Sequence, residues 1–178
     1  MSSQARIAKV SNRLYWLVSA VLLAAPVGVI WAFGYAFAHP DFLLTTFPNL
    51  PPETQITPLK SGLVIALGAF TFLPLLMAFV HMRGLFGRYR RAEILTNPCA
   101  QHITRIGQWL MGAAGMALAL PTLQGLALTF DNPPGARVLS ISASSNTVAV
   151  FLIAGLLTVI GWALRDAARI ADENAGFV

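Results

Sequence analysis

The residues that could do chemistry in this chain are few, and the most suggestive ones lie in its central segment. Cys99 and His102 form a Cys-x-x-His pair, and His81 precedes them in the sequence. Thiolate and imidazole groups are common ligands of zinc and of haem iron. A structural zinc site takes four ligands at close spacing, however, and a lone pair of this kind is common by chance. We therefore predict no metal site and no cofactor, and the single cysteine excludes an internal disulfide.

Groups suited to acid–base or nucleophilic catalysis are also scarce. The sequence has no glycine-rich phosphate loop, no paired carboxylates and no nucleophile elbow. Glu93 stands among arginines, so we expect it to be a charge partner rather than a general base. His81, Thr122 and Gln124 are polar groups within apolar stretches, where we expect hydrogen bonds between helices or positions at the membrane surface. We predict that the chain is not an enzyme and has no catalytic residues.

Four apolar stretches without Asp, Glu, Lys or Arg must position these side chains. Each is long enough to cross the hydrocarbon layer of about 30 Å, which takes about 20 helical residues, and in lipid a helix pairs its backbone amides within its own segment. Apolar residues make up 56% of the chain and charged residues only 11%, against roughly 25% charged in soluble domains. We therefore predict an all-α membrane bundle, one domain over 1–178, with transmembrane helices at about 14–38, 61–82, 106–130 and 147–164.

Ten of the twelve Lys and Arg residues flank these spans on one side of the predicted membrane. They precede the first span, separate the second from the third, and follow the fourth, whereas Lys60 and Arg137 belong to the other side. Basic segments are retained in the cytoplasm, which is the positive-inside rule. We thus predict a multi-pass membrane protein with both termini cytoplasmic. Its parts would be outer loops over 39–60 and 131–146, a cytoplasmic loop over 83–105 and a cytoplasmic tail over 165–178.

The net charge of +5 has two interpretations, nucleic-acid binding and anchoring at a membrane surface. The arginines flank apolar spans and do not form one continuous basic face, which favours the membrane. We predict contact with the lipid bilayer and no direct contact with nucleic acid.

The first span also resembles a secretory signal peptide, because a basic start and an apolar run lead to the triplet Ala36-Phe37-Ala38. Its length over 14–38 exceeds the apolar region of about 7–15 residues that signal peptides contain. We expect this segment to be retained as a membrane helix, and cleavage stays an alternative.

Prolines and small residues inside the spans predict local packing. Pro26, Pro74 and Pro121 remove backbone donors and predict kinks in the first three helices. In the third helix, Gly115 and Ala119 have the spacing that lets backbones approach closely, so we expect a close-packing face there, which also includes Gly107 and Gly112.

The outer loops differ in composition from the spans. The segment 39–60 is too rich in proline for a regular helix and is expected to form a cap. In the second loop, the alternation that follows Arg137 fits either a short strand or the approach to the fourth helix.

The central loop resembles a known family of bacterial membrane proteins, the YoaS-like family. The segment 84–96 reads Gly-Leu-Phe-Gly-Arg-Tyr-Arg-Arg-Ala-Glu-Ile-Leu-Thr and is followed by Arg-Ile-Gly at 105–107. It is similar to the family's Leu-x-x-Leu-Phe-x-x-Tyr segment, its Gly-Glu-x-Phe-Thr turn and the Arg-Ile-Gly that opens its third helix. The tail at 164–178 resembles the family's ending. The chain departs at Ala92, where glycine is usual, and at Leu95, where phenylalanine is usual.

The resemblance implies a four-helix integral membrane protein, a domain of unknown function, and some members are encoded beside small helix-turn-helix regulators. We therefore predict an uncharacterised non-enzymatic inner-membrane protein that acts as a sensor or as the partner of a cytoplasmic regulator, for example a helix-turn-helix protein. The alternatives are a small transport or channel component and a quinone- or haem-binding redox subunit. The spans lack the charged residues that transporters usually place at mid-membrane depth. The oligomeric state stays open.

The loop and the tail together supply the candidate interaction surface on the cytoplasmic side. Carboxylates of the tail either pair with the loop arginines and clamp the two segments together, or belong to a solvated belt of charge. The surface comprises Arg88, Tyr89, Arg91, Glu93, Thr96, Arg105, Arg165, Asp172 and Glu173.

Overall fold

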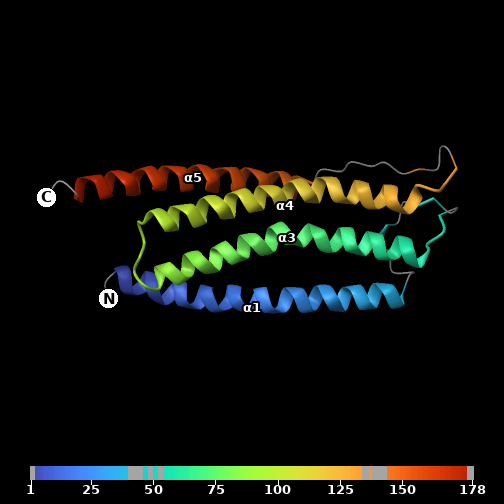
Figure 1. The fold of residues 1–178 in the computed structure, drawn as a ribbon, viewed down its shortest axis with the longest axis horizontal. Helices are drawn as coiled ribbons and strands as arrows, with labels where there is room; N and C mark the ends of the chain where they lie inside the picture. The colour runs from blue at the N-terminus through green and yellow to red at the C-terminus, as the bar shows by residue number, and fades with distance from the viewer. Residues whose placement is uncertain are drawn as a thin grey trace.

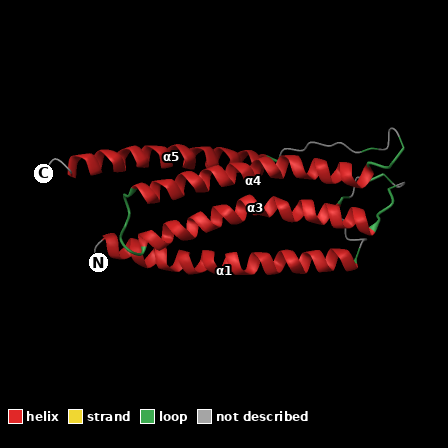
Figure 2. Cartoon of the chain, in the orientation of Figure 1, coloured by secondary structure: helices red, strands yellow, loops and turns green. Residues whose placement is uncertain are grey.

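The structure, a computed structural model, describes residues 3–39, 46–47, 50–51, 54–133, 137 and 144–175. Each of its helices is long and apolar enough to cross a membrane, and Figure 2 shows helices joined by loops, without a strand in the described chain. The predicted all-α class with four potential spans is therefore confirmed. The helices are α1 (Ser3–Ala38), α3 (Pro58–Tyr89), α4 (Asn97–Thr129) and α5 (Ser145–Ala175).

The helices extend beyond the predicted spans. α3 continues through Tyr89 and α4 begins at Asn97, so only residues 90–96 connect them within the predicted cytoplasmic loop over 83–105. α1 has 36 residues, which at 1.5 Å per residue is about 54 Å and exceeds the hydrocarbon thickness of about 30 Å. A membrane helix of this length would tilt or extend beyond the hydrocarbon. The segment 138–143, for which we predicted either a short strand or the approach to the fourth helix, lies outside the described residues.

The four helices lie side by side in one row that follows their order in the chain (Figure 1). α4 packs along α3 and α5, α1 packs along α3, and the other pairs of described helices make at most slight contact. The predicted bundle of four helices is thus arranged as an open row. An open row is compatible with a membrane, because hydrocarbon chains solvate apolar side chains as well as another helix does. Leu23 and Trp31 of α1 are 76% and 70% exposed, and in a membrane lipid would cover such apolar side chains.

The closest packing between helices occurs where α4 crosses α5. A Cβ atom added to Gly107 would lie 2.7 Å from the backbone nitrogen of Thr158, and one added to Gly161 would lie 2.6 Å from the backbone nitrogen of Thr104. Gly115, in contrast, has open space where its side chain would be, and Ala119 is exposed. The close approach that we predicted for the third helix therefore exists, but at Gly107 and not at the Gly115-xxx-Ala119 pair.

The prolines are accommodated inside continuous helices. Pro26, Pro74 and Pro121 lie within α1, α3 and α4. Figure 1 shows α3 changing direction near its middle, and Pro74 lies in the middle of that helix by residue number.

The row has two different ends. The start of α1, the α3–α4 turn and the end of α5 lie together at one end, called here the turn end, and the end of α1, the start of α3 and the end of α4 lie at the opposite end, called the loop end (Figure 1). Because the helices alternate in direction, ten of the twelve Lys and Arg residues belong to the turn end.

Candidate functional site

The α3–α4 turn is closed by the backbone hydrogen bonds of a Schellman motif. The amide of Glu93 donates to the carbonyl of Arg88 at 3.2 Å, and the amide of Ala92 donates to the carbonyl of Tyr89 at 3.2 Å. The motif needs a left-handed residue, and Ala92 supplies it with φ of 63°. The chain therefore reverses direction within few residues and brings the end of α3 against the start of α4.

Side chains reinforce this turn. Arg88 Nη1 donates to Glu93 Oε2 at 2.9 Å. Glu93 is therefore a charge partner, as predicted, and the arginine that it pairs with is Arg88. The thiol of Cys99 donates to the carbonyl of Glu93 at 3.1 Å and accepts from the Thr96 hydroxyl at 3.2 Å. Cys99 is 1% exposed. Its thiol is thus part of the packing between the turn and α4.

Tyr89 belongs to the same packing. It lies against a buried cluster of Leu85, Cys99 and Ile106, which joins α3 to α4 and reaches Leu157 of α5. This aromatic ring therefore anchors the turn instead of standing free on the candidate interaction surface.

His81 and His102 face each other from α3 and α4, with their Nδ1 atoms 3.3 Å apart. The ring of His102 packs on Gly84, where an added Cβ would lie 2.5 Å from Cε1. The Cys99 thiol makes its hydrogen bonds elsewhere, and among the described residues no three His, Cys, Asp or Glu side chains are grouped as metal ligands. The pairing of the two imidazoles was not predicted, because it depends on how α3 and α4 face each other.

Tyr15 ties α1 to the turn end. Arg83 Nη2 donates to the Tyr15 hydroxyl at 3.0 Å, and the guanidinium carbons of Arg83 and Arg90 lie 5.2 Å and 4.6 Å from the centre of the ring. These distances are those of cation–π contacts. The sequence showed only that Tyr15 is an aromatic residue at the end of the first span, so its arginine partners were missed.

Two cavities open beside these residues, and Arg88 and His102 line both of them. The α1-side cavity has about 360 Å³ and also meets Tyr15, Arg83 and Arg91. The α5-side cavity has about 350 Å³; its lining includes Arg105 from α4 and Arg165 from α5. No described carboxylate lines either cavity. Each cavity is thus strongly cationic and is suited to binding an anion.

The carboxylates Asp172 and Glu173 of α5 do not pair with the arginines of these cavities. Asp172 and Glu173 are exposed, and Glu173 Oε1 lies 3.9 Å from Nε of Arg169 in the same helix. Within 144–173, no side-chain carboxylate forms an ion pair with an arginine of the turn. Of our two alternatives, the described residues therefore fit the solvated belt. The other predicted surface residues, which gather at the turn end, are Arg88, Tyr89, Arg91, Glu93, Thr96, Arg105 and Arg165.

No family model, curated protein or solved structure matches this chain.

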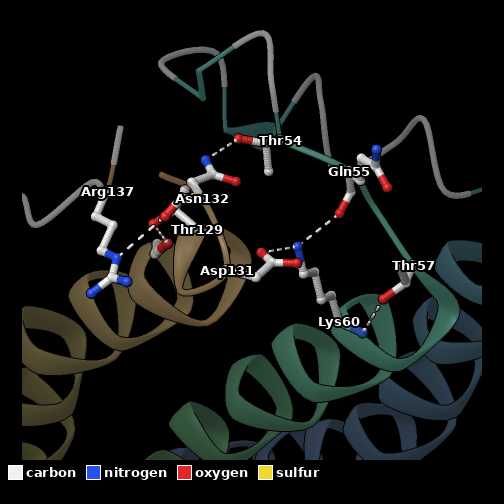
Figure 3. A network of polar contacts seen from close by, with 9 residues as sticks. Thr54, Gln55, Thr57, Lys60, Thr129, Asp131, Asn132 and Arg137 are labelled. Atoms are coloured by element: carbon white, nitrogen blue, oxygen red, sulfur yellow. Dashed lines mark hydrogen bonds and ion pairs between the residues drawn. The ribbon is translucent and has the colours of Figure 1, made fainter. Parts of the chain in front are cut away.

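A second polar cluster lies at the loop end and joins α3 to α4 (Figure 3). Lys60 is 4% exposed, and its Nζ donates to Asp131 Oδ1 at 2.5 Å and to the carbonyl of Gln55 at 2.9 Å. The ammonium group also lies 5.7 Å from the centre of the Phe130 ring. A buried ammonium without such partners would be strongly unfavourable. The hydrogen bond from Lys60 lowers the pKa of Asp131 below its ordinary value of 3.8.

The connection around Thr54 is held by the same cluster. Asn132 Nδ2 donates to Thr54 Oγ1 at 2.9 Å, and Arg137 Nε donates to the carbonyl of Asn132 at 3.4 Å (Figure 3). Deeper in the row, Gln124 Nε2 donates to the carbonyl of Val64 at 2.9 Å, which confirms its predicted role between helices. Both basic residues of the loop end thus have partners. The sequence contained one signal for the pairing of Lys60 with Asp131. The second and third spans are antiparallel, so the start of one and the end of the other lie on the same side.

Proposed function

We propose that this chain is a non-enzymatic protein of a bacterial inner membrane, with both termini and the α3–α4 turn in the cytoplasm. The orientation is inferred from one observation, that ten of the twelve Lys and Arg residues lie at the turn end of the row (Figure 1). Basic segments next to spans are translocated poorly, so the end that carries them stays inside.

Cysteine accessibility tests this orientation. In a Cys99→Ala background, Arg91→Cys should react with a membrane-impermeant maleimide only after the cells are lysed, because Arg91 lies in the turn. Arg137→Cys should react in spheroplasts, where the outer surface of the inner membrane is accessible. Labelling of Arg91→Cys in intact spheroplasts would contradict the proposal.

The role at the cytoplasmic end is the binding of a protein partner. Leu95 is 75% exposed at the turn, beyond the ends of α3 and α4. In the proposed orientation hydrocarbon does not cover this side chain. Arg90 and Arg91, which belong to the same turn, are also exposed. An apolar anchor with a basic rim fits a partner that offers an apolar pocket with acidic residues around it.

Site-specific photo-crosslinking in cells tests this role. A photoreactive residue in place of Leu95 should capture a cytoplasmic protein. The same residue in place of Leu59, which is 82% exposed at the loop end, should not. If the two positions give the same products, the partner proposal fails, whatever the result for the orientation.

The resemblance to the YoaS-like family suggests that the partner is a helix-turn-helix regulator. Ala92 has φ of 63° at the position where that family usually has glycine, which is compatible with the resemblance. Transcript levels in a strain without this protein test the regulatory part of the proposal. Unchanged transcription together with no captured regulator would refute it.

A specific observation also favours one alternative, the binding of an apolar molecule such as a quinone. A cavity of about 430 Å³ between α1, α3 and α4 is lined by apolar side chains, among them Phe33 and Phe72, with Gln124 as a polar group. Ligand pockets are commonly of this size and character. Solvent extraction of the protein purified in mild detergent, followed by absorbance spectroscopy, would reveal a bound quinone.

A further inference from the structure

Three arginines from three helices meet at the α5-side cavity: Arg88 of α3, Arg105 of α4 and Arg165 of α5. Arg88 is paired with Glu93, whereas Arg105 and Arg165 form no ion pair with a described carboxylate. The rest of the lining is also rich in polar groups, since it contains two imidazoles and the amide of Gln101. The cavity thus gathers positive charge for which the described chain supplies little compensation.

An anion with several acceptor oxygens would satisfy this arrangement. Like charges around a shared space repel each other, and guanidinium groups bind phosphate oxygens through two parallel hydrogen bonds. The start of α4 contributes as well, because Pro98 of its first turn lines the cavity. That turn has no acidic residue, and the Thr96 side chain makes no capping hydrogen bond. The positive end of the helix dipole therefore adds to the charge of the arginines.

The depth of the cavity indicates where such an anion comes from. Arg105 directly precedes the predicted span over 106–130, and Arg165 directly follows the span over 147–164. Arg88 lies six residues beyond Met82, or about 9 Å along α3 at 1.5 Å per residue. The headgroup region extends roughly 5–8 Å beyond the hydrocarbon on each side. The arginines therefore frame the level at which lipid phosphates lie.

We infer that the α5-side cavity binds a phosphate group, which an anionic phospholipid headgroup or a soluble phosphate ion supplies. The inference goes beyond the proposed partner role and rests on the proposed function only for the position of the turn end at the headgroup layer. Basic pockets between transmembrane helices on the cytoplasmic side are suited to lipid headgroups.

Native mass spectrometry of the full chain in mild detergent tests the lipid source. Wild-type protein should retain phosphatidylglycerol in preference to zwitterionic phosphatidylcholine. Arg165→Gln should bind phosphatidylglycerol about tenfold more weakly, the effect expected for one charge-assisted contact. Arg169→Gln is the matched control, because Arg169 lies one turn further along α5 and is exposed like Arg165, but does not line the cavity. Its affinity should stay within about twofold of wild type.

Thermal unfolding with inorganic phosphate tests the soluble source, with chloride at equal ionic strength as the reference. A rise in the midpoint that Arg165→Gln abolishes and Arg169→Gln keeps would assign a soluble phosphate. Arg165→Lys should bind either ligand with intermediate affinity, since it keeps the charge and loses the paired hydrogen bonds. An Arg165-dependent effect of either ligand supports the phosphate site.

Equal binding of both ligands by wild type, Arg165→Gln and Arg169→Gln would overturn the inference. Circular dichroism of each variant separates loss of binding from loss of fold. The partner proposal is tested independently by crosslinking at Leu95, so either idea can fail while the other stands.

Discussion

Lys60 and Asp131 form an ion pair in which the two partners are buried to very different extents. Their side chains are 5% and 48% exposed, respectively, and the pair joins the start of α3 to the residues after α4. The cost of losing one partner depends on the solvation of the group left behind, so the two halves of this pair should not be equivalent.

Asp131→Asn should therefore destabilise the protein more than Lys60→Met does. The first change leaves a buried ammonium without its carboxylate counter-charge, whereas the second leaves a carboxylate that water can solvate. The thermal midpoint in mild detergent should fall by several degrees for Asp131→Asn and by less for Lys60→Met. The double variant should lie near Lys60→Met. An equal or larger fall for Lys60→Met would contradict the asymmetry.

The stability of the loop end should also depend on pH in a defined direction. The folded-state pKa of Asp131 is lowered by the Lys60 hydrogen bond, so its contribution is complete above the unfolded value of about 3.8 and is lost as the pH falls through the folded value. The loss of stability that follows from protonation of Asp131 should thus begin only below about pH 4. Unfolding of wild type and Asp131→Asn across acidic pH measures this difference. A difference that disappears already at pH 5 would refute the lowered pKa.

Two glycines of α4 should respond differently to the same substitution. Gly107→Ala places a methyl group 2.7 Å from backbone atoms of α5 and should cost about 1–3 kcal/mol through overpacking. Gly115→Ala meets open space and should change stability by about 1 kcal/mol at most, in the stabilising direction. Thermal unfolding would measure the change in stability, and disulfide trapping between α4 and α5 would measure how closely the two helices still approach. Similar losses for both variants would show that the close contact is elsewhere.

The left-handed residue of the turn offers a stabilising substitution. Ala92→Gly removes the steric cost of positive φ and should raise the free energy of unfolding by about 1 kcal/mol. Ala167→Gly is the control, because Ala167 is an exposed residue inside α5 and should lose about 1 kcal/mol. Chemical denaturation of both variants checks the opposite signs. A loss of stability for Ala92→Gly would exclude the Schellman geometry.

The sequence predicted the helices and the separation of basic residues because both depend on composition along the chain. It did not predict which sides of the helices meet. In lipid both faces of a helix are apolar, so no amphipathic pattern reports its rotation. The small-residue spacing at Gly115 was therefore misleading, while the contact of Gly107 with Thr158 needed the structure. The pairing of His81 with His102 escaped prediction for the same reason.

The order of the helices in the row bears on how the protein is made. Among the described helices that precede it in the chain, each helix packs mainly on the nearest one, so a span inserted into a membrane during synthesis would find its docking surface already in place. Insertion and tertiary assembly can then proceed together during synthesis, and no early helix has to wait for a distant part of the polypeptide.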